Sequence, residues 1–220
     1  MTQGFARPEF LVETDWLAGH LQDPGVRVLD CTTHLPPLPD NSYYTVRPGR
    51  DDFLKGHIPG SAFVDMDHDV ADTSASFHFM LPSSLQFAEA MSALGVGHDT
   101  LVVSYSSANH WWATRMWWML RVFGHQRAAV LNGGFQKWRK EGRPVESGAA
   151  GPRTRTRFEH SGGSAPSASP TQPGSGSRRS RQVFTAWSNG FSIAHHDQIA
   201  EIGLFLVALR FPKDQKSPKK

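Results

Sequence analysis

The sequence predicts an α/β domain in which a parallel sheet is flanked by helices on both faces. Short strand-like runs alternate with helix-like runs through the first 150 of the 220 residues, which is the order that crossover connections produce. Two of the strand-like runs are largely apolar, as buried parallel strands are. Hydrophobic residues make up 39% of the chain, which is enough to fill a core beneath two helical layers.

Four runs are predicted to form strands because each is bounded by turn-forming residues. The first alternates in polarity and leads into a proline-rich stretch at residues 36–41. The second follows a Pro-Gly turn, and the last two are rich in small and β-branched side chains. The predicted strands cover residues 26–30, 62–65, 100–105 and 128–131.

Three helices are predicted in this part of the chain. Ser83 and Gln86 have the spacing of a capping box, and the helix that they begin should stop at Gly95. The other two helices are expected at residues 111–123 and 135–141. The helix at 111–123 is apolar on nearly all sides, so it should pack against the sheet and against a second surface.

The composition changes at about residue 151. Half of the residues from 151 to 182 are Ser, Gly or Pro, and such a segment cannot bury enough apolar surface to offset the entropy of ordering it. Residues 1–150 hold 12 Lys and Arg against 16 Asp and Glu, whereas residues 151–220 hold 11 against 4. We therefore expect a folded domain at residues 8–147 and a disordered or unrelated low-complexity tail at residues 151–220.

The basic pI near 9.2 belongs to this tail and is not a property of the domain. Its arginines have almost no aromatic residues between them, so any affinity for nucleic acid would be nonspecific and sensitive to salt. Translation of GC-rich coding DNA in the wrong reading frame would give the same composition. The sequence therefore predicts no specific nucleic-acid partner.

Several other classes of protein are disfavoured by the residue content. Cys31 is the only cysteine, which excludes an intramolecular disulfide and a cysteine-based zinc finger. Residues 65–69 imitate the start of a calcium loop, but Val70 and Ser76 stand where that loop needs Gly and Glu. No stretch reaches the length of a membrane span. We expect a cytoplasmic protein with no membrane partner, no metal and no cofactor.

Two groups of motifs carry a family resemblance. Residues 56–61, Gly-His-Ile-Pro-Gly-Ser, together with residues 27–30, resemble the early motif of rhodanese-type sulfurtransferases. Residues 115–125 and 130–138 are similar to the N-terminal domain of the two-domain thiosulfate or 3-mercaptopyruvate sulfurtransferases. The resemblance covers about residues 8–147. It implies an active loop at the carboxyl edge of the sheet, and it marks Asp30, His57 and Arg115 as motif residues.

The resemblance also implies where a nucleophile would stand. In competent members of the family a cysteine directly follows the central strand, and its thiolate carries the transferred sulfur as a persulfide. Converging amides at a helix N-terminus would stabilise that thiolate. In this chain the position is held by Ser106, which cannot form a persulfide. We therefore expect a vestigial anion-binding loop formed by Ser106, Ser107, Ala108, Asn109 and His110.

Three other assignments compete with this interpretation. Cys31 follows a strand at the same sheet edge, but His34 is its only obvious activator, and free cysteines are usually buried. A serine hydrolase is disfavoured because no glycine flanks Ser106 or Ser107. His57 is expected to shape its turn and not to act as a base.

The tryptophan-rich helix at residues 111–123 suggests a partner. The resemblance places this helix near the second domain of the tandem enzymes. We therefore expect an exposed apolar patch that includes Trp111 or Trp112, through which the chain contacts a catalytic rhodanese domain or another protein.

The predicted function is half of a rhodanese-family sulfurtransferase with little or no activity of its own. The family reaction is the transfer of sulfane sulfur from thiosulfate or 3-mercaptopyruvate to a thiophilic acceptor. A noncatalytic rhodanese-like binding module that uses the loop and the tryptophan face remains open. A sulfur carrier that uses Cys31 is the remote alternative.

Overall fold

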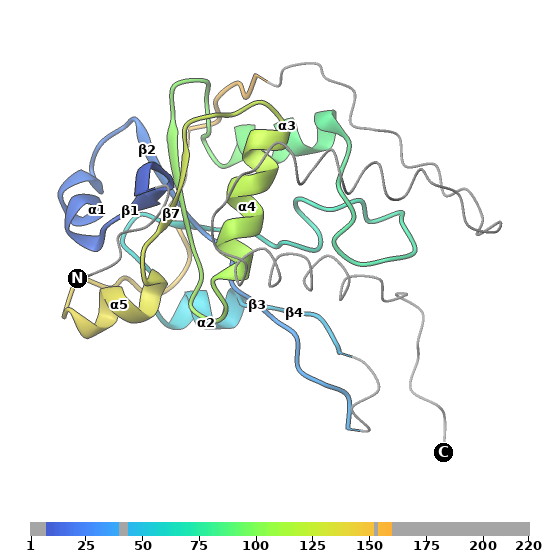
Figure 1. Cartoon of the computed structure of the whole chain (residues 1–220), viewed down its shortest axis with the longest axis horizontal. Helices are drawn as coiled ribbons and strands as arrows, with labels where there is room; N and C mark the ends of the chain where they lie inside the picture. The colour runs from blue at the N-terminus through green and yellow to red at the C-terminus, as the bar shows by residue number, and fades with distance from the viewer. Residues whose placement is uncertain (1–7, 40–43, 152–153, 160–220) are drawn as a thin grey trace.

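The computed structural model describes residues 8–39, 44–151 and 154–159, and these form an α/β domain (Figure 1). Five strands make one sheet in the order β1-β7-β6-β2-β5, and every pair in it is parallel. The strands are β1 (Leu11–Val12), β2 (Val26–Asp30), β3 (Thr33–His34), β4 (Arg47–Pro48), β5 (Ala62–Phe63), β6 (Leu101–Tyr105) and β7 (Ala128–Leu131). The helices are η1 (Pro8–Phe10, 3-10), α1 (Thr14–His20), α2 (Arg50–Lys55), α3 (Ser84–Ala93), α4 (Trp111–Val122) and α5 (Gly134–Lys140).

The centre of the sheet is β6, which pairs with β2 on one side and β7 on the other. The β2–β6 register runs over five residue pairs, from Val26 opposite Leu101 to Asp30 opposite Tyr105. Because the strands are parallel, the loops that follow β2, β6 and β7 leave from the same edge of the sheet. This carboxyl edge is where open α/β sheets bind ligands.

Helices cover both faces of the sheet, as the sequence predicts, and each face has its own apolar cluster. Figure 1 shows α3 and α4 on one side of the sheet, with α1 on the other. The first cluster packs α3 and α4 against the sheet and includes Phe87, Met116 and Leu120. The second packs α1 and α5 against the opposite face, with Leu17 and Trp138 at zero exposure.

The start of α3 matches half of the predicted capping box. The Gln86 backbone N–H donates to Ser83 Oγ at 3.2 Å, which satisfies one of the free amides at the helix start. The Gln86 side chain does not return to the Ser83 amide, however, and donates instead to the carbonyl of Ala71 at 2.8 Å. The end matches the prediction, since Gly95 adopts a φ of +74° directly after the helix C-cap.

The helix α4 is buried more completely than expected. Trp112 is 1% exposed and belongs to the first cluster. Its ring is tilted against the Phe79 ring, with the two centroids 4.8 Å apart. The expected exposed patch therefore excludes Trp112, because the chain's own loop before α3 covers it. Trp111 and Trp118 are half-buried and lie at the margin of the same cluster. This arrangement explains why the helix is apolar on more than one side.

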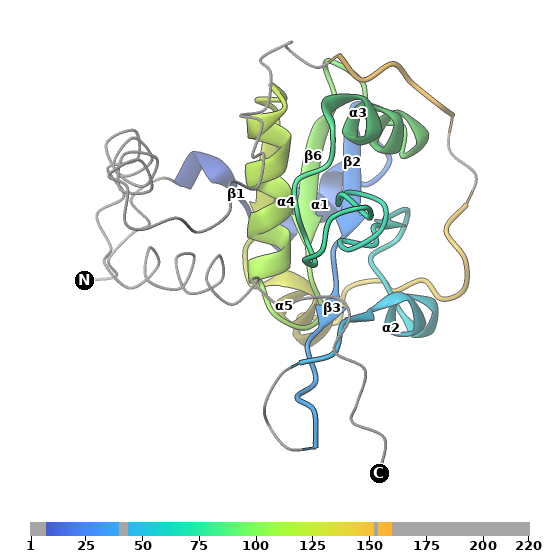
Figure 2. The same ribbon diagram turned by 90° about the vertical axis from the view of Figure 1, so that its right-hand side faces the viewer.

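Some elements were not predicted from the sequence. The strand β1 and the helix α1 precede the first predicted strand, and the antiparallel pair β3–β4 forms a hairpin that projects from the domain (Figures 1 and 2). The predicted strand at residues 62–65 is shorter in the structure, where β5 is Ala62–Phe63.

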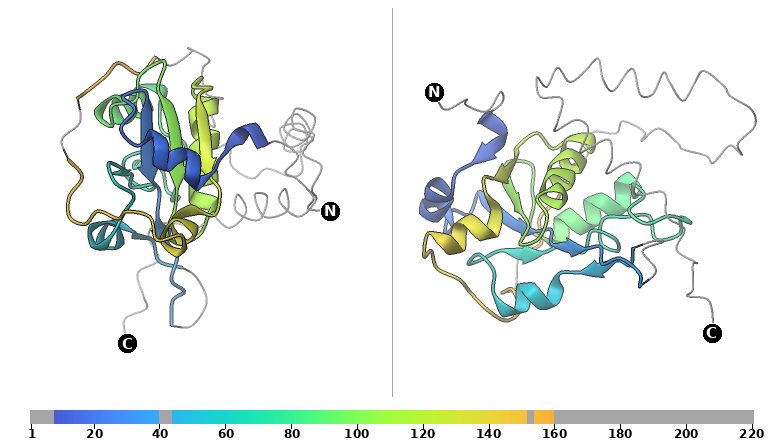
Figure 3. Two further views of the ribbon diagram at one scale, coloured as in Figure 1. Left: turned by 90° about the vertical axis from the view of Figure 1, so that its left-hand side faces the viewer. Right: turned by 60° about the horizontal axis from the view of Figure 1, so that its bottom comes forward.

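The packed part of the chain continues beyond residue 147. Residues 144–148 run beside α2, where His57 and Glu146 exchange two backbone hydrogen bonds and the Gly148 amide donates to the Leu54 carbonyl. Figure 3 shows this segment continuing along the side of the domain toward α3. Phe158 then enters the first cluster with 4% of its surface exposed. The rest of the expected tail, residues 160–220, lies outside the described residues.

The described helices include none that is long and apolar enough to cross a membrane.

Candidate functional site

The loop at residues 106–110 leaves the carboxyl end of β6, the central strand, and leads directly into α4. Ser106 is buried, whereas Ser107, Ala108 and Asn109 are partly exposed and His110 is exposed. Two neighbouring segments touch this loop: Thr32, which follows β2, and the turn before α5, which follows β7. The structure thus brings the residues of the predicted loop together at the edge where the sequence places them.

Two backbone amides of this loop, and the first amide of α4, donate hydrogen bonds to side chains of the same chain. The Ser107 amide donates to Thr32 Oγ1 at 2.8 Å, and the Ala108 amide donates to Ser106 Oγ at 3.1 Å. In the first turn of α4, the Trp111 amide donates to Asn109 Oδ1 at 3.0 Å. These N–H groups are therefore occupied by the protein's own oxygens, unlike the open amides expected of an anion-binding loop.

The serine hydroxyls of the loop have hydrogen-bond partners that do not activate them. Ser106 Oγ accepts from a backbone amide, and Ser107 Oγ lies 3.1 Å from Thr32 Oγ1. A serine nucleophile needs a base to take its proton. The geometry thus agrees with the argument against a serine hydrolase.

The turn before α5 holds the loop from the other side. Gly134 has a φ of +55°, and a Cβ placed there would lie 2.9 Å from the Ser106 carbonyl oxygen. The Gln136 side chain donates to the Ser107 carbonyl at 2.8 Å, and the Phe135 amide donates to the Ser106 carbonyl at 3.4 Å. Only glycine fits the close approach at residue 134, which fixes the path of the Ser106 backbone.

A buried polar network lies beneath the loop. Asp30 accepts hydrogen bonds from the amide of Thr32 at 2.8 Å and from the Thr32 hydroxyl. The Tyr105 hydroxyl lies 3.1 Å from Ser61 Oγ and accepts from the Ile58 amide at 3.2 Å. Burial raises the pKa of Asp30, and the hydrogen bonds from Thr32 oppose that rise. The network lies where the loop after β2, the turn before β5 and the end of β6 meet.

Cys31 lies at the same sheet edge but is inaccessible. Its side chain has zero exposure, and its amide donates to the Tyr105 carbonyl at 2.9 Å. Burial raises the pKa of the Cys31 thiol well above its usual value, and the neighbouring Asp30 raises it further. The thiol is therefore protonated at neutral pH and shielded from solvent, whereas the thiolate is the reactive form of cysteine.

The other two motif residues hold loops in place. His57 is buried, its Nδ1 donates to the Phe53 carbonyl at 2.8 Å and its ring stacks on the Phe53 ring at 3.8 Å. The buried Arg115 donates from α4 to the carbonyl of Phe79, whose φ is +59°. Burial lowers the pKa of Arg115 to about 10, and Asp67 partly offsets this change.

The described residues contain no group of three or more His, Cys, Asp or Glu side chains placed to hold a metal ion. The carboxylates of the calcium-like stretch bind backbone amides instead. Asp65 Oδ1 accepts from the amides of Asp67 and His68, and Asp69 Oδ2 accepts from the amide of Asp65.

Sequence reasoning missed two residues that shape this site. Thr32 is separated from Ser107 by 75 positions, and nothing in its local sequence indicates the contact. Gln136 sits two residues after the Gly133-Gly134 turn that the sequence does mark. That turn is the one signal from which a contact with the neighbouring loop could have been suspected.

The chain has a parallel sheet between two helical layers, and at the carboxyl edge a loop joins its central strand to a helix N-terminus. These features define a class of α/β proteins whose chemistry takes place in that loop. The family model of the Rhodanese-like domain matches residues 13–141. The chain therefore belongs to the rhodanese family.

Similar proteins include known sulfurtransferases. Thiosulfate sulfurtransferase of Cricetulus griseus is 41% identical over 143 residues, which are 62% of this chain and 45% of that protein. 3-Mercaptopyruvate sulfurtransferase of Escherichia coli is 35% identical over 140 residues, which are 64% and 47% of the two chains. The crystal structure of SseA from Escherichia coli is 33% identical with a TM-score of 0.61 and covers 71% of this chain and 56% of that one. The chain spans less than half the length of these curated relatives.

Proposed function

We propose that this chain is the noncatalytic half of a two-domain sulfurtransferase and that it works together with a second rhodanese domain that carries the cysteine. One observation carries the proposal. The loop after the central strand begins with a hydroxyl, Ser106, whereas the only thiol of the chain, Cys31, has zero exposure. Sulfane sulfur is carried as a persulfide on a cysteine, so the chain lacks an accessible atom for that step.

The occupied amides of the loop support the same proposal. A competent loop would keep its N–H groups for the thiolate and the anionic donor. Here Thr32 and Ser106 accept two of the loop amides, and Asn109 accepts the Trp111 amide at the start of α4. The loop is therefore built as a rigid support, and the substrate of the complete protein would be thiosulfate or 3-mercaptopyruvate, as in its relatives.

A partner surface on α4 belongs to the proposal. Trp111, Trp118 and Val122 lie seven and four positions apart, which places them on one side of the helix. The two tryptophans are half-buried and Val122 is 42% exposed. This side of α4 would meet a catalytic rhodanese domain.

An activity assay tests the catalytic part of the proposal. Transfer of sulfur to cyanide from thiosulfate and from 3-mercaptopyruvate is measured for the wild-type chain and for Cys31→Ser. We expect both to stay at the background rate. Turnover by the wild type that disappears in Cys31→Ser would overturn the proposal and establish the sulfur carrier.

The coding DNA tests the partner part. Translation of the other two reading frames beyond codon 150 should yield a second rhodanese domain with a cysteine in its loop. If none is found, a self-sufficient binding module accounts better for the closed loop.

Where such a domain is found, its binding to the wild-type chain is compared with its binding to Trp118→Lys. Trp16→Lys is the matched control, because Trp16 is 38% exposed on α1 at the opposite face. We expect Trp118→Lys alone to weaken the complex at least tenfold. Equal binding of both variants would place the interface elsewhere.

The cytoplasmic location stays a prediction, and one plant relative is named as mitochondrial.

A further inference from the structure

An aromatic side chain far along the chain fills a slot on the face covered by α3 and α4. Phe158 is 4% exposed, and its ring meets Phe87 edge-on at a centroid distance of 5.7 Å and His125 at 5.5 Å. The floor of the slot is the stacked pair of Phe87 and Phe123, 4.2 Å apart. The slot lies at the amino edge of the sheet, since His125 precedes β7 and its Nε2 donates to the carbonyl of Thr100, just before β6.

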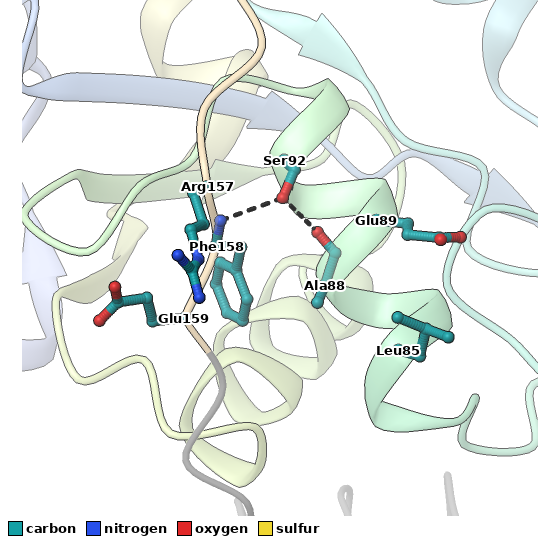
Figure 4. A pocket seen from close by; sticks show the side chains of 7 residues that line it. All are labelled: Leu85, Ala88, Glu89, Ser92, Arg157, Phe158 and Glu159. Atoms are coloured by element: carbon teal, nitrogen blue, oxygen red, sulfur yellow. Dashed lines mark hydrogen bonds between the residues drawn. The ribbon is translucent and has the colours of Figure 1, made fainter.

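The backbone around Phe158 is bound as an extended peptide. The Phe158 amide donates to Ser92 Oγ at 3.0 Å (Figure 4). The Thr156 amide donates to the Ser92 carbonyl at 3.1 Å. Ser92 Oγ in turn donates to the Ala88 carbonyl at 2.6 Å, which fixes its lone pairs toward the segment. One residue of α3 thus holds two alternate amides of the segment.

The side chains of the segment alternate in the same way. Thr156 and Phe158 point to the domain and are at least partly buried, whereas the intervening positions 155, 157 and 159 are exposed. Gly95, with no side chain, leaves room for the Thr154 carbonyl, because a Cβ there would lie 3.1 Å from that oxygen. Alternating anchors and paired amides are the features by which proteins recognise extended peptides.

The surface that receives the segment extends past it. A groove of about 530 Å³ runs along α3 beside Phe158 (Figure 4). Leu85, 65% exposed, stands at its far end. Phe158, Arg157 and Glu159 line this groove together with α3, so open space remains beside the bound segment.

We propose that α3, the turn at Gly95 and His125 form a peptide-binding groove, and that residues 154–159 are the ligand that occupies it within the chain. Its ligands are extended peptides with a small β-branched residue two positions before an aromatic residue. The hydroxyl of Thr156 is buried without a hydrogen-bond partner among the described residues, so the groove selects the shape of this residue and not its polarity. The proposal does not depend on sulfur transfer.

A fluorescent peptide with the sequence of residues 154–159 tests the groove. It is titrated into the full chain carrying Phe158→Ala, in which the aromatic slot is empty, and into the wild-type chain. We expect saturable binding to the variant with a dissociation constant at least tenfold lower than for the wild type. A peptide with Phe158→Ala keeps both arginines and should bind neither chain, which separates recognition from charge attraction. A peptide with Thr156→Val should bind as well as the parent or better.

Two results would overturn the proposal. One is a folded Phe158→Ala chain that does not distinguish the parent peptide from its alanine form. The other comes from hydrogen exchange in the wild-type chain, which stays informative even if the variant fails to fold. A segment that acts as a ligand should release its amides at residues 156 and 158 by local opening, faster than the amides of β6. Exchange at the same slow rate would make the segment part of the core.

Discussion

The two edges of the sheet are held by different interactions, although the same strands end at both. At the carboxyl edge, Thr32 accepts the Ser107 amide of the loop after β6, and Asn109 accepts the Trp111 amide at the start of α4. At the amino edge, Phe158 fills an aromatic slot beside α3. Hydrogen bonds fix a conformation but add little net stability, whereas burial of an aromatic ring adds a great deal. We therefore expect the contacts of Thr32 and Asn109 to specify the shape of the carboxyl edge, and the Phe158 ring to contribute more to the stability of the fold.

Removing the ring at the amino edge should have the largest effect. Phe158→Ala empties a nearly buried aromatic site, and such changes cost about 3–5 kcal/mol of the free energy of unfolding. Urea denaturation gives the value. Leu85→Ala, on the same groove but mostly exposed, is the control and should change stability by less than about 0.5 kcal/mol. Equal losses in the two variants would contradict the assigned role of the amino edge.

At the carboxyl edge, Thr32→Val should have the next largest effect. The substitution keeps the shape of the side chain but leaves the Ser107 amide without its acceptor and Asp30 without one donor. The expected loss is about 1–3 kcal/mol. Thr45→Val is the control, because the Thr45 hydroxyl is exposed and bonds only at 3.4 Å. If Thr32→Val lowers the free energy of unfolding by more than Phe158→Ala does, the carboxyl edge and not the amino edge contributes more to stability.

Ser92→Ala refines the amino edge by removing its polar contact and leaving the ring. The Phe158 amide then lacks its side-chain acceptor, which should cost about 1 kcal/mol. Thermal unfolding followed by circular dichroism measures this loss. A cost equal to that of Phe158→Ala would mean that the hydrogen bond, and not the ring, anchors the segment.

The smallest effect is a dependence on pH through His125. Burial lowers the pKa of His125, while hydrogen bonds to the backbone and the nearby His98 and Arg127 modify it. The unfolded chain then binds more protons than the folded one, so His125 favours the folded state above pH 6.5 and this contribution falls as the pH drops below 6.5.

The difference between the wild type and His125→Gln isolates this contribution, because Asp30 and Asp69, whose pKa values are raised, titrate alike in both chains. Unfolding free energies at pH 5 and pH 8 give the result. An identical pH dependence of the two chains would mean that protonation of His125 does not contribute to the stability of the amino edge.

Most of the sheet could be predicted from the sequence because its central strands carry local signals. The runs at β2, β6 and β7 and the helix α4 have turn residues at their ends and clear apolar patterns. The short elements β1 and α1 lack such patterns, since α1 buries only Thr14 and Leu17. They exist because the sheet and α5 provide a surface for them, which no local window shows.

The sequence predicted that the loop at residues 106–110 follows the central strand, but it did not predict the hydrogen bonds that the loop makes with distant residues. The position of Ser106 after the central strand follows from the strand pattern together with the resemblance. The contacts that close the loop join residues that are distant in sequence, and so does the burial of Phe158 in an arginine-rich stretch. The expected patch at Trp111 or Trp112 does not include Trp112, because residues before α3 fold back over it, whereas Trp111 is half-buried.

Cys31 gives the chain a built-in reporter. The chain contains one sulfhydryl, which directly follows β2 and is packed in the first apolar cluster at zero exposure. A small thiol reagent can reach it only when this packing opens, so its rate of labelling in native buffer reports that opening. Because Cys31 is the single cysteine of the sequence, this measurement needs no engineered probe and has no signal from a second thiol.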